Sequence, residues 1–480
     1  MFLEITYSII FTILIGSGLY AIYLSRFQHN HTTSDFISAK KHPFARVMWS
    51  MYSASVGAWV SVAPSQFASY AGILGLIMYA FSSALPILVV AFLSDKMPKV
   101  ASLNDYIGKR YGKRSQMFIV ILSILNMGVA LIAEYTTIGS IFEDIVGSYS
   151  APIMIAIGVI TMTYTSVGGV GVSIITDQLL ALMTMILLLI TGIYISIYFR
   201  PALGELPYNL DINAAGFSSL LTFPLSMISS TVFSESMWQR VYASMDKRSL
   251  YLSSIISSFI VFIVILFYGL VGFFANWAGL ITDATNPNTY FFHIFLDMKS
   301  WVVICAVVIA ALMCQSAVDS MQNALAAAIC TNLFPFKHVN YARLTVLLIN
   351  IPAIGISLLM LPILNLFLLV NLLTTSCLIP LLIGLYYPLY TEWMFLTSCV
   401  MGIVGISALG MIESKSFLDG FYLAWFDNGY DYKYFLVAVG IPLLLSIVLL
   451  FGFKNVKNKF ISSYLDIFSS RYSIIVILRF

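Results

Sequence analysis

Of the 480 residues in the chain, 60% are hydrophobic and only 9% are charged. Soluble globular proteins carry a charge on about a quarter of their residues, so this composition excludes an ordinary soluble protein and predicts a polytopic membrane protein. The net charge of +3 is no indication of nucleic-acid binding, because the basic residues follow the expected membrane topology.

Hydropathy predicts about thirteen membrane-spanning helices, each of which needs about 20 apolar residues. No cleavable signal is expected, because the first apolar run is long, carries Glu4 and lacks a basic leading region. The predicted spans are 4–24, 46–70, 73–94, 115–142, 150–167, 172–199, 217–240, 250–276, 299–333, 341–362, 365–389, 393–413 and 433–453.

The basic residues orient these spans in the membrane. With the N-terminus outside, all 24 Lys and Arg residues fall on the inner side except Arg200, Lys299, Lys415 and Lys433. The positive-inside rule therefore predicts an outer N-terminus and a cytoplasmic C-terminus in the cell membrane. The inner segment SDKMPKVASLNDYIGKRYGKRS is expected to form a short interfacial helix. The late apolar run SIIVIL is too short to span.

Two predicted spans depart from a plain apolar helix. The second has a face of small residues, Ser50, Ser53, Gly57 and Ser61, that ends at Pro64. The seventh carries Pro224 and a run of hydroxyl side chains. Interrupted helices five spans apart are typical of inverted-repeat transporters, which bind substrate near the membrane midplane between the repeats.

The ninth span carries a polar face inside an apolar helix. Ser316, Asp319, Ser320 and Asn323 fall at i, i+3, i+4 and i+7, which places them on one side. A charge in hydrocarbon costs several kcal/mol, so this face should border a protein-lined cavity. The pattern fits an ion or substrate site, or a polar stripe that joins helices.

Three further acids lie within or at the ends of spans. Glu134 is too deep to reach the interface and needs a partner or a water-filled cavity. Asp177 lies near the inner surface. It is either a functional carboxylate or a hydrated carboxylate at a helix end. Glu235 either pairs with Arg240 or lies at the interface.

Enzyme chemistry has no support in the sequence. There is no phosphate-cradling Gly-Lys-Ser/Thr loop, no His-Glu motif on a helix and no aspartate-rich metal spacing. The five cysteines lie in apolar stretches without paired or zinc-type spacing. We expect no enzyme activity, no catalytic residues, no cofactor and no metal other than a coupling sodium ion.

Five segments within residues 34–333 resemble the sodium:solute symporter family, which includes the sodium/glucose and sodium/proline carriers. They are SDFISAKK, ASLNDYIGKRYGKR, YTSVGGVGVSIITDQLL, WQRVYASMDKRS and SAVDSMQNAL. The resemblance implies a leucine-transporter-like core of two inverted five-helix repeats. Residues 1–45 would form an extra helix and inner loop, 46–390 the core, and 391–480 two further helices and a tail.

The resemblance also implies a sodium site between core helices one and eight. Matching the family pattern places ligand carbonyls at Ser53, Val56 and Met313 and a ligand hydroxyl at Ser316. The second hydroxyl of the pattern falls on Ala317, and losing it should weaken sodium binding unless another oxygen compensates. Asp177 matches an aspartate thought to help sodium leave to the cytoplasm.

The expected function is sodium-coupled symport of a small organic solute by alternating access. Trp59 matches a position beside the substrate cavity, Ser320 faces the same space, and Glu134 is added because of its depth. Two alternatives stay open. One is proton coupling through Asp319, Asp177 or Glu134; the other is a transporter-like sensor or uncoupled pathway. Expected partners are the solute, sodium or protons, and lipid, without nucleic acid.

Overall fold

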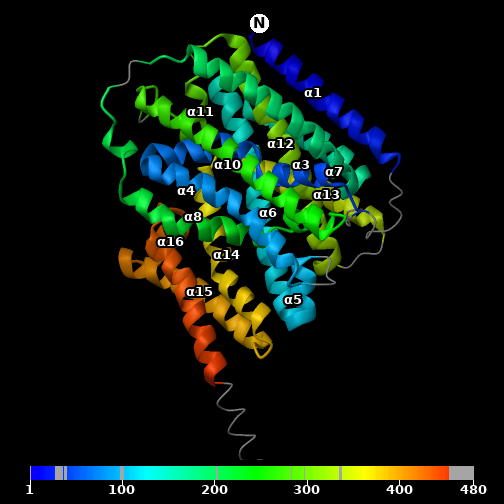
Figure 1. Ribbon diagram of the computed structural model, residues 1–480, viewed down its shortest axis with the longest axis vertical. Helices are drawn as coiled ribbons and strands as arrows, with labels where there is room; N and C mark the ends of the chain where they lie inside the picture. Colours follow the sequence, from blue (N-terminus) through cyan, green and yellow to red (C-terminus); the bar gives the residue numbers. More distant parts are fainter. Residues whose placement is uncertain are drawn as a thin grey trace, which may run out of the picture.

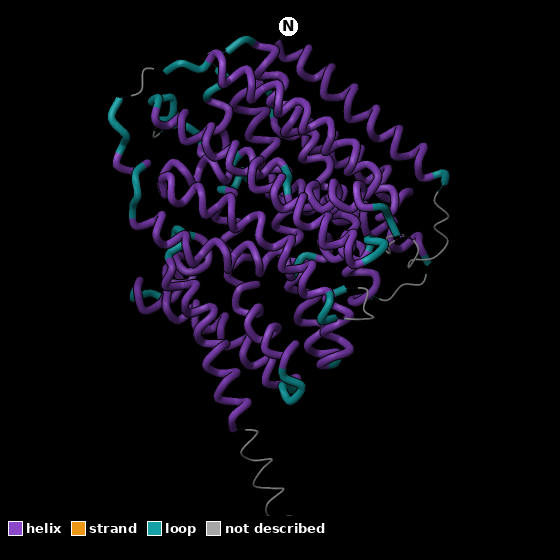
Figure 2. Tube along the Cα trace, in the orientation of Figure 1, coloured by secondary structure: helices purple, strands orange, loops and turns teal. Residues whose placement is uncertain are grey.

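The computed structural model is a bundle of helices joined by loops and turns (Figures 1 and 2). It describes residues 2–27, 36, 41–97, 102–201, 204–282, 284–296, 298–334 and 338–452. Most of SDFISAKK and all of the run SIIVIL lie outside the described residues. The prediction of an all-α polytopic membrane protein is confirmed.

The first half of the described chain begins with α1 (Phe2–Ser25). Its further elements are α3 (Phe44–Ser55), η1 (Ala58–Ser61), α4 (Ala63–Ser94), α5 (Leu103–Tyr111), α6 (Lys113–Ile141), η2 (Phe142–Val146) and α7 (Ser150–Tyr198). The predicted inner-loop helix corresponds to α5, where the Ser102 side chain accepts a hydrogen bond from the Asp105 amide and so caps the first turn.

The second half begins at a short turn, η3 (Tyr208–Leu210). Its further elements are α8 (Ala214–Val232), α9 (Glu235–Tyr242), α10 (Lys247–Trp277), η4 (Pro287–Thr289), α11 (Tyr290–His293), α12 (Ser300–Ala328), η5 (Ile329–Leu333), α13 (Val339–Ser357) and α14 (Ile363–Tyr386). The helices that follow are α15 (Glu392–Ser414), α16 (Phe417–Phe426) and Tyr432–Gly452.

Among the described residues, eleven helices are long and apolar enough to cross a membrane. Two of them contain a glycine with a non-helical backbone, Gly72 in α4 and Gly169 in α7. At 1.5 Å per residue, the 49 residues of α7 are far too long for one crossing of about 30 Å. Both glycines fall where the sequence predicts a boundary between two spans. The total of thirteen stays a prediction.

Helix α12 lies at the centre of the bundle and is the most buried of the candidate spans. It packs against α7, α6, α13, α9 and α3, while α4 packs against α10 and α8. Because α3, η1 and α9 all contact α12, the interrupted elements α3–η1 and α8–α9 flank the same central region.

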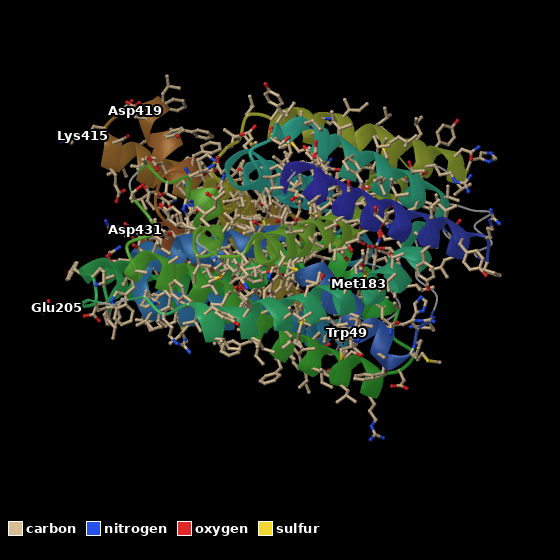
Figure 3. The ribbon with its side chains drawn as sticks, turned by 90° about the horizontal axis from the view of Figure 1, so that it is seen from above. Trp49, Met183, Glu205, Lys415, Asp419 and Asp431 are labelled. Carbon is tan, nitrogen blue, oxygen red and sulfur yellow. The ribbon has the colours of Figure 1, made fainter. Side chains whose placement is uncertain are left out.

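The loops predicted on the outer side share one end of the molecule. Glu205 lies in the loop before α8, and Lys415, Asp419 and Asp431 lie around α16; all four side chains project from the same end in Figure 3. Loops that lie on the same side of the membrane must be at the same end of the molecule, as these are.

Gly72 provides a test of the turn inside α4. Its φ of 65° and ψ of −164° suit glycine almost alone, and a Cβ there would meet the backbone oxygen of Asp211. We expect Gly72→Ala to lower the free energy of unfolding by about 1–3 kcal/mol, seen as a lower midpoint of thermal unfolding in detergent.

Gly128→Ala is the matched control, because Gly128 lies within α6 and a Cβ added there would meet open space. Its midpoint should stay equal or rise slightly. Equal losses in the two variants would contradict the account of Gly72.

Candidate functional site

The first interruption of the core lies between α3 and η1. Val56 and Gly57 have extended backbones, and the last backbone N–H bond of α3 runs from Val56 to the Tyr52 carbonyl. The carbonyls of residues 53–56 therefore have no partner inside α3. Gly57 lets the Glu134 carboxylate approach the backbone here, because a Cβ at this position would overlap the carboxylate and displace it. The predicted break is confirmed, and it frees the predicted ligand carbonyls of Ser53 and Val56 from the helix.

The second interruption lies at Phe233 and Ser234, between α8 and α9. Pro224 is inside α8, so the break comes later in the chain than the proline suggested. The carbonyl of Val232 at the end of α8 accepts a 2.7 Å bond from Trp238 Nε1, and the carbonyl of Ser230 accepts one of 2.7 Å from Asn126 Nδ2.

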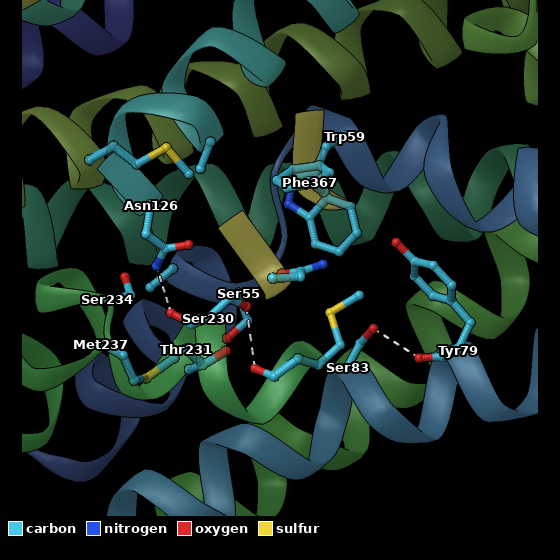
Figure 4. Close-up of a pocket in the computed structure, with 15 residues that line it drawn as sticks. Ser55, Trp59, Tyr79, Ser83, Asn126, Ser230, Thr231, Ser234, Met237 and Phe367 are labelled. Carbon is cyan, nitrogen blue, oxygen red and sulfur yellow. Dashed lines mark hydrogen bonds between the residues drawn. The ribbon is translucent and has the colours of Figure 1, made fainter. Parts of the chain in front are cut away.

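A cavity of about 120 Å³ lies between the two interruptions (Figure 4). Its wall combines hydroxyl, amide, thioether and aromatic side chains, and none of its lining residues is acidic or basic. The lining residues are Ala54, Ser55, Trp59, Tyr79, Ser83, Asn126, Ala130, Met227, Ser230, Thr231, Ser234, Met237, Met321, Phe367 and Asn371. Trp59 thus borders the cavity, and its ring is 5.6 Å from that of Phe367.

A smaller cavity adjoins the first and shares five lining residues with it: Ala54, Asn126, Ala130, Ser234 and Met321. Ser320 and Ala317 of α12 line this second space. Of the predicted substrate residues, Trp59 and Ser320 therefore border the two adjoining cavities, whereas Glu134 lines neither.

Beside the cavities, Asp177 forms a buried ion pair with Arg240. Arg240 Nη2 is 3.1 Å from Asp177 Oδ2, and both side chains are fully buried. Ser50 donates to the same oxygen at 2.6 Å, and Ser316 donates to Oδ1 at 2.8 Å. The hydrated helix end is therefore wrong for Asp177, which is a buried and fully bonded carboxylate.

The guanidinium of Arg240 is held by hydroxyl groups from four elements. It donates to Ser320 at 2.5 Å, to Ser50 at 3.2 Å, to Ser173 at 3.3 Å and to Ser236 at 3.3 Å. These contacts join α3, α7, α9 and α12 around one buried charge. A buried pair of this kind is stable only when further hydrogen bonds satisfy both partners.

The suggested pair between Glu235 and Arg240 is wrong. Residues five apart in a helix point in directions that differ by about 140°, so the side chains of Glu235 and Arg240 leave different faces of α9. Glu235 instead accepts a 3.1 Å bond from Asn104 Nδ2 of α5. Arg240 reaches inward to Asp177.

The polar face of α12 is divided between two environments. Ser316 and Ser320 point toward Asp177 and Arg240. Asp319 faces α7, where Thr165 donates to it at 2.5 Å, and Asn323 donates to it from the next turn at 3.1 Å. The expected single face toward a cavity therefore applies to Ser320 and not to Asp319.

The remaining predicted ion ligands are Ser53 near the end of α3 and Met313 in α12. Ser53 donates from its hydroxyl to the Asp177 carbonyl at 3.3 Å. Met313 is inside the unbroken helix α12, and its sulfur accepts a hydrogen bond from the Tyr268 hydroxyl.

Glu134, fully buried on α6, accepts a 2.8 Å hydrogen bond from the Ala58 amide at the start of η1.

Sequence reasoning did not identify two residues of this region. Arg240 was assigned to the inner surface, and its burial depends on the break between α8 and α9. Asn126 is a lone amide inside an apolar span, and such a polar side chain is itself a signal for a site.

Known structures with the same architecture are transport proteins. A Na⁺-coupled sialic acid symporter in a substrate-bound outward-open state has a TM-score of 0.69 at 14% identity, over 92% of this chain and 96% of that one. The chain has the leucine-transporter-like fold. MhsT in complex with L-phenylalanine has a TM-score of 0.55 at 15% identity, over 86% of this chain and 99% of that one. Mhp1, a nucleobase-cation-symport-1 family transporter, has a TM-score of 0.53 at 15% identity, over 88% of this chain and 94% of that one.

The sequence is also similar to a curated relative, the spermidine transporter DUR31 of Candida albicans. The two are 26% identical over 310 residues, which are 63% of this chain and 60% of that protein. The chain therefore spans less than two thirds of the relative's length. No family model matches the chain, so membership of the sodium:solute symporter family stays a prediction.

Arg240→Met tests the buried ion pair. Without the guanidinium, the Asp177 carboxylate loses its counter-charge, and we expect a loss of about 3–5 kcal/mol in the free energy of unfolding. Thermal unfolding in detergent measures the effect. The double variant with Asp177→Asn should regain part of the loss.

Lys247→Met is the control, because Lys247 pairs with Asp95 at 2.7 Å with 77% of its side chain exposed. Exposed pairs contribute about 0–1 kcal/mol. If Arg240→Met were no less stable than Lys247→Met, the structural role of the buried pair would be refuted.

Proposed function

We propose that the chain is a secondary active transporter of the cell membrane that couples sodium to the uptake of a small polar solute. The observation that carries the proposal is the cavity between two interrupted helices, α3–η1 and α8–α9. Interrupted helices expose backbone groups where they line a cavity, which is how inverted-repeat transporters bind ions and solutes.

The break in α3 supports the proposal of a cation-binding site. Its free carbonyls at residues 53–56 lie beside Ser316 and Asp177, and hard cations such as sodium prefer oxygen ligands. We assign the coupling ion to this region, with Ser53, Val56, Met313 and Ser316 as its proposed oxygen donors.

The lining of the cavity supports the proposal that the solute is neutral. Its wall has no charged residue, while Ser55, Thr231 and Asn126 supply hydroxyl and amide groups. Trp59 and Phe367 supply aromatic faces. A small neutral molecule with several hydrogen-bonding groups satisfies such a wall without burying an unpaired charge.

A polyamine is the second candidate. The curated relative is a spermidine transporter, and aromatic rings can bind an ammonium group through their faces. Trp59, Tyr79 and Phe367 offer such faces in the cavity.

Closure on the outer side would come from Tyr430. Its ring stacks on Phe223 at 5.1 Å, and its hydroxyl accepts a 3.2 Å bond from Asn371, which also lines the cavity. In this proposal the N-terminus is outside, residues 46–390 form the transport core, and the movement of Tyr430 away from Asn371 opens the outer path.

Uptake into proteoliposomes tests the function. The purified chain should accumulate a radiolabelled neutral polar solute, from a panel that also contains spermidine, only with an inward sodium gradient. Trp59→Ala should reduce uptake roughly tenfold, which corresponds to about 1.4 kcal/mol of lost binding free energy.

Trp393→Ala is the matched control, because that tryptophan is 55% exposed on α15. Uptake driven by a proton gradient alone would contradict sodium coupling and favour Asp319, Asp177 or Glu134 as the coupling group. Equilibration without accumulation would indicate an uncoupled pathway, and no uptake of any panel member would favour a sensor.

A further inference from the structure

Around the break in α3 and the adjoining part of α12, two buried carboxylates, Asp319 and Glu134, have no ion pair among the described residues. Asp177 is neutralised by Arg240, and its two oxygens are occupied by Arg240, Ser50 and Ser316. Both oxygens of Asp319 have hydrogen-bond donors, because Thr165 and Asn323 donate to Oδ1 and Thr176 donates to Oδ2. Glu134 has no ion pair among the described residues.

The two oxygens of Glu134 differ sharply. Oε2 accepts the Ala58 amide at 2.8 Å and so holds the first residue of η1. Oε1 is fully buried and accepts no hydrogen bond of regular geometry in the described part of the chain, although the Trp59 amide of η1 also faces the carboxylate. An unpaired carboxylate oxygen in an apolar bundle is costly unless it serves a ligand.

The unpaired oxygen points at the place where α3, η1 and α12 meet. A Cβ built on Gly57 would overlap Glu134 Oε1 and would lie 3.0 Å from the Ala317 methyl group. Oε1 and Ala317 therefore border the same point, next to the free carbonyls of residues 53–56. At this point α12 offers a methyl group and no oxygen, while Glu134 offers an anionic oxygen.

We propose that the Glu134 carboxylate is a direct ligand of the coupling cation, in the position where Ala317 supplies no oxygen. Oε2 fixes the break through Ala58, and Oε1 binds the ion together with the α3 carbonyls. This inference rests on the proposed cation coupling and identifies the anion that stabilises the ion.

Glu134→Gln tests the ligand, because the amide oxygen of Gln can still accept the Ala58 N–H while the negative charge is lost. Sodium-dependent stabilisation of the purified chain in detergent is measured at constant pH and ionic strength, with choline as replacement. We expect the apparent sodium affinity to fall by roughly tenfold to a hundredfold.

Two further variants complete the experiment. Glu143→Gln removes an exposed acid from η2, which directly follows α6, and should keep the wild-type affinity. Adding Ala317→Ser to Glu134→Gln supplies a hydroxyl at the same point and should recover part of the lost affinity.

The outcomes separate this inference from the proposed function. A wild-type sodium response that is unchanged in Glu134→Gln overturns the ligand role and leaves sodium coupling intact. No sodium response in the wild type overturns both. If Glu134→Gln does not fold, the single variant Ala317→Ser tests the inference. Tighter sodium binding in this variant supports a cation position shared by Glu134 Oε1 and residue 317, and unchanged or weaker binding overturns it.

Discussion

Every charge buried in this bundle needs a partner, and the pair of Asp177 and Arg240 sets the arrangement around it. The pair holds serines from α3, α7, α9 and α12 in hydrogen-bond contact, so the interrupted helices cannot move independently of α12 and α7. Removing water from two charges is expensive, and only this complete set of donors and acceptors makes the burial tolerable. The pair therefore acts as a structural centre, and the end of α3, whose last carbonyls have no partner inside the helix, lies next to it.

The breaks in α3 and between α8 and α9 supply what a continuous helix cannot. A regular helix consumes its own backbone groups, whereas these ends present carbonyls to the interior. Gly57 allows the carboxylate of Glu134 to approach the first break, and the cavity forms where the second break faces it. In the proposed function the ion and the solute bind beside these two breaks, which is the physical basis for coupling them through a common change of shape.

Much of this architecture could be predicted from the sequence because it depends on local features. Long apolar runs, the small-residue face ending at Pro64, and polar residues inside spans mark the helices and the first break. The partners of the buried charges could not be predicted in this way. Arg240 contacts Asp177 across 63 residues, Ser50 across 190 and Ser320 across 80, and no short-range pattern encodes such contacts. The same holds for Glu134, whose depth was evident but whose contact with Ala58 was not.

Equilibrium binding of radioactive sodium to the purified chain tests the central claim most directly. With choline keeping the ionic strength constant, the account predicts saturable binding that Ser316→Ala weakens, because that hydroxyl adjoins both Asp177 and the freed α3 carbonyls. Binding that does not saturate, or that potassium displaces as readily as sodium, would contradict a specific sodium site at the interrupted helix.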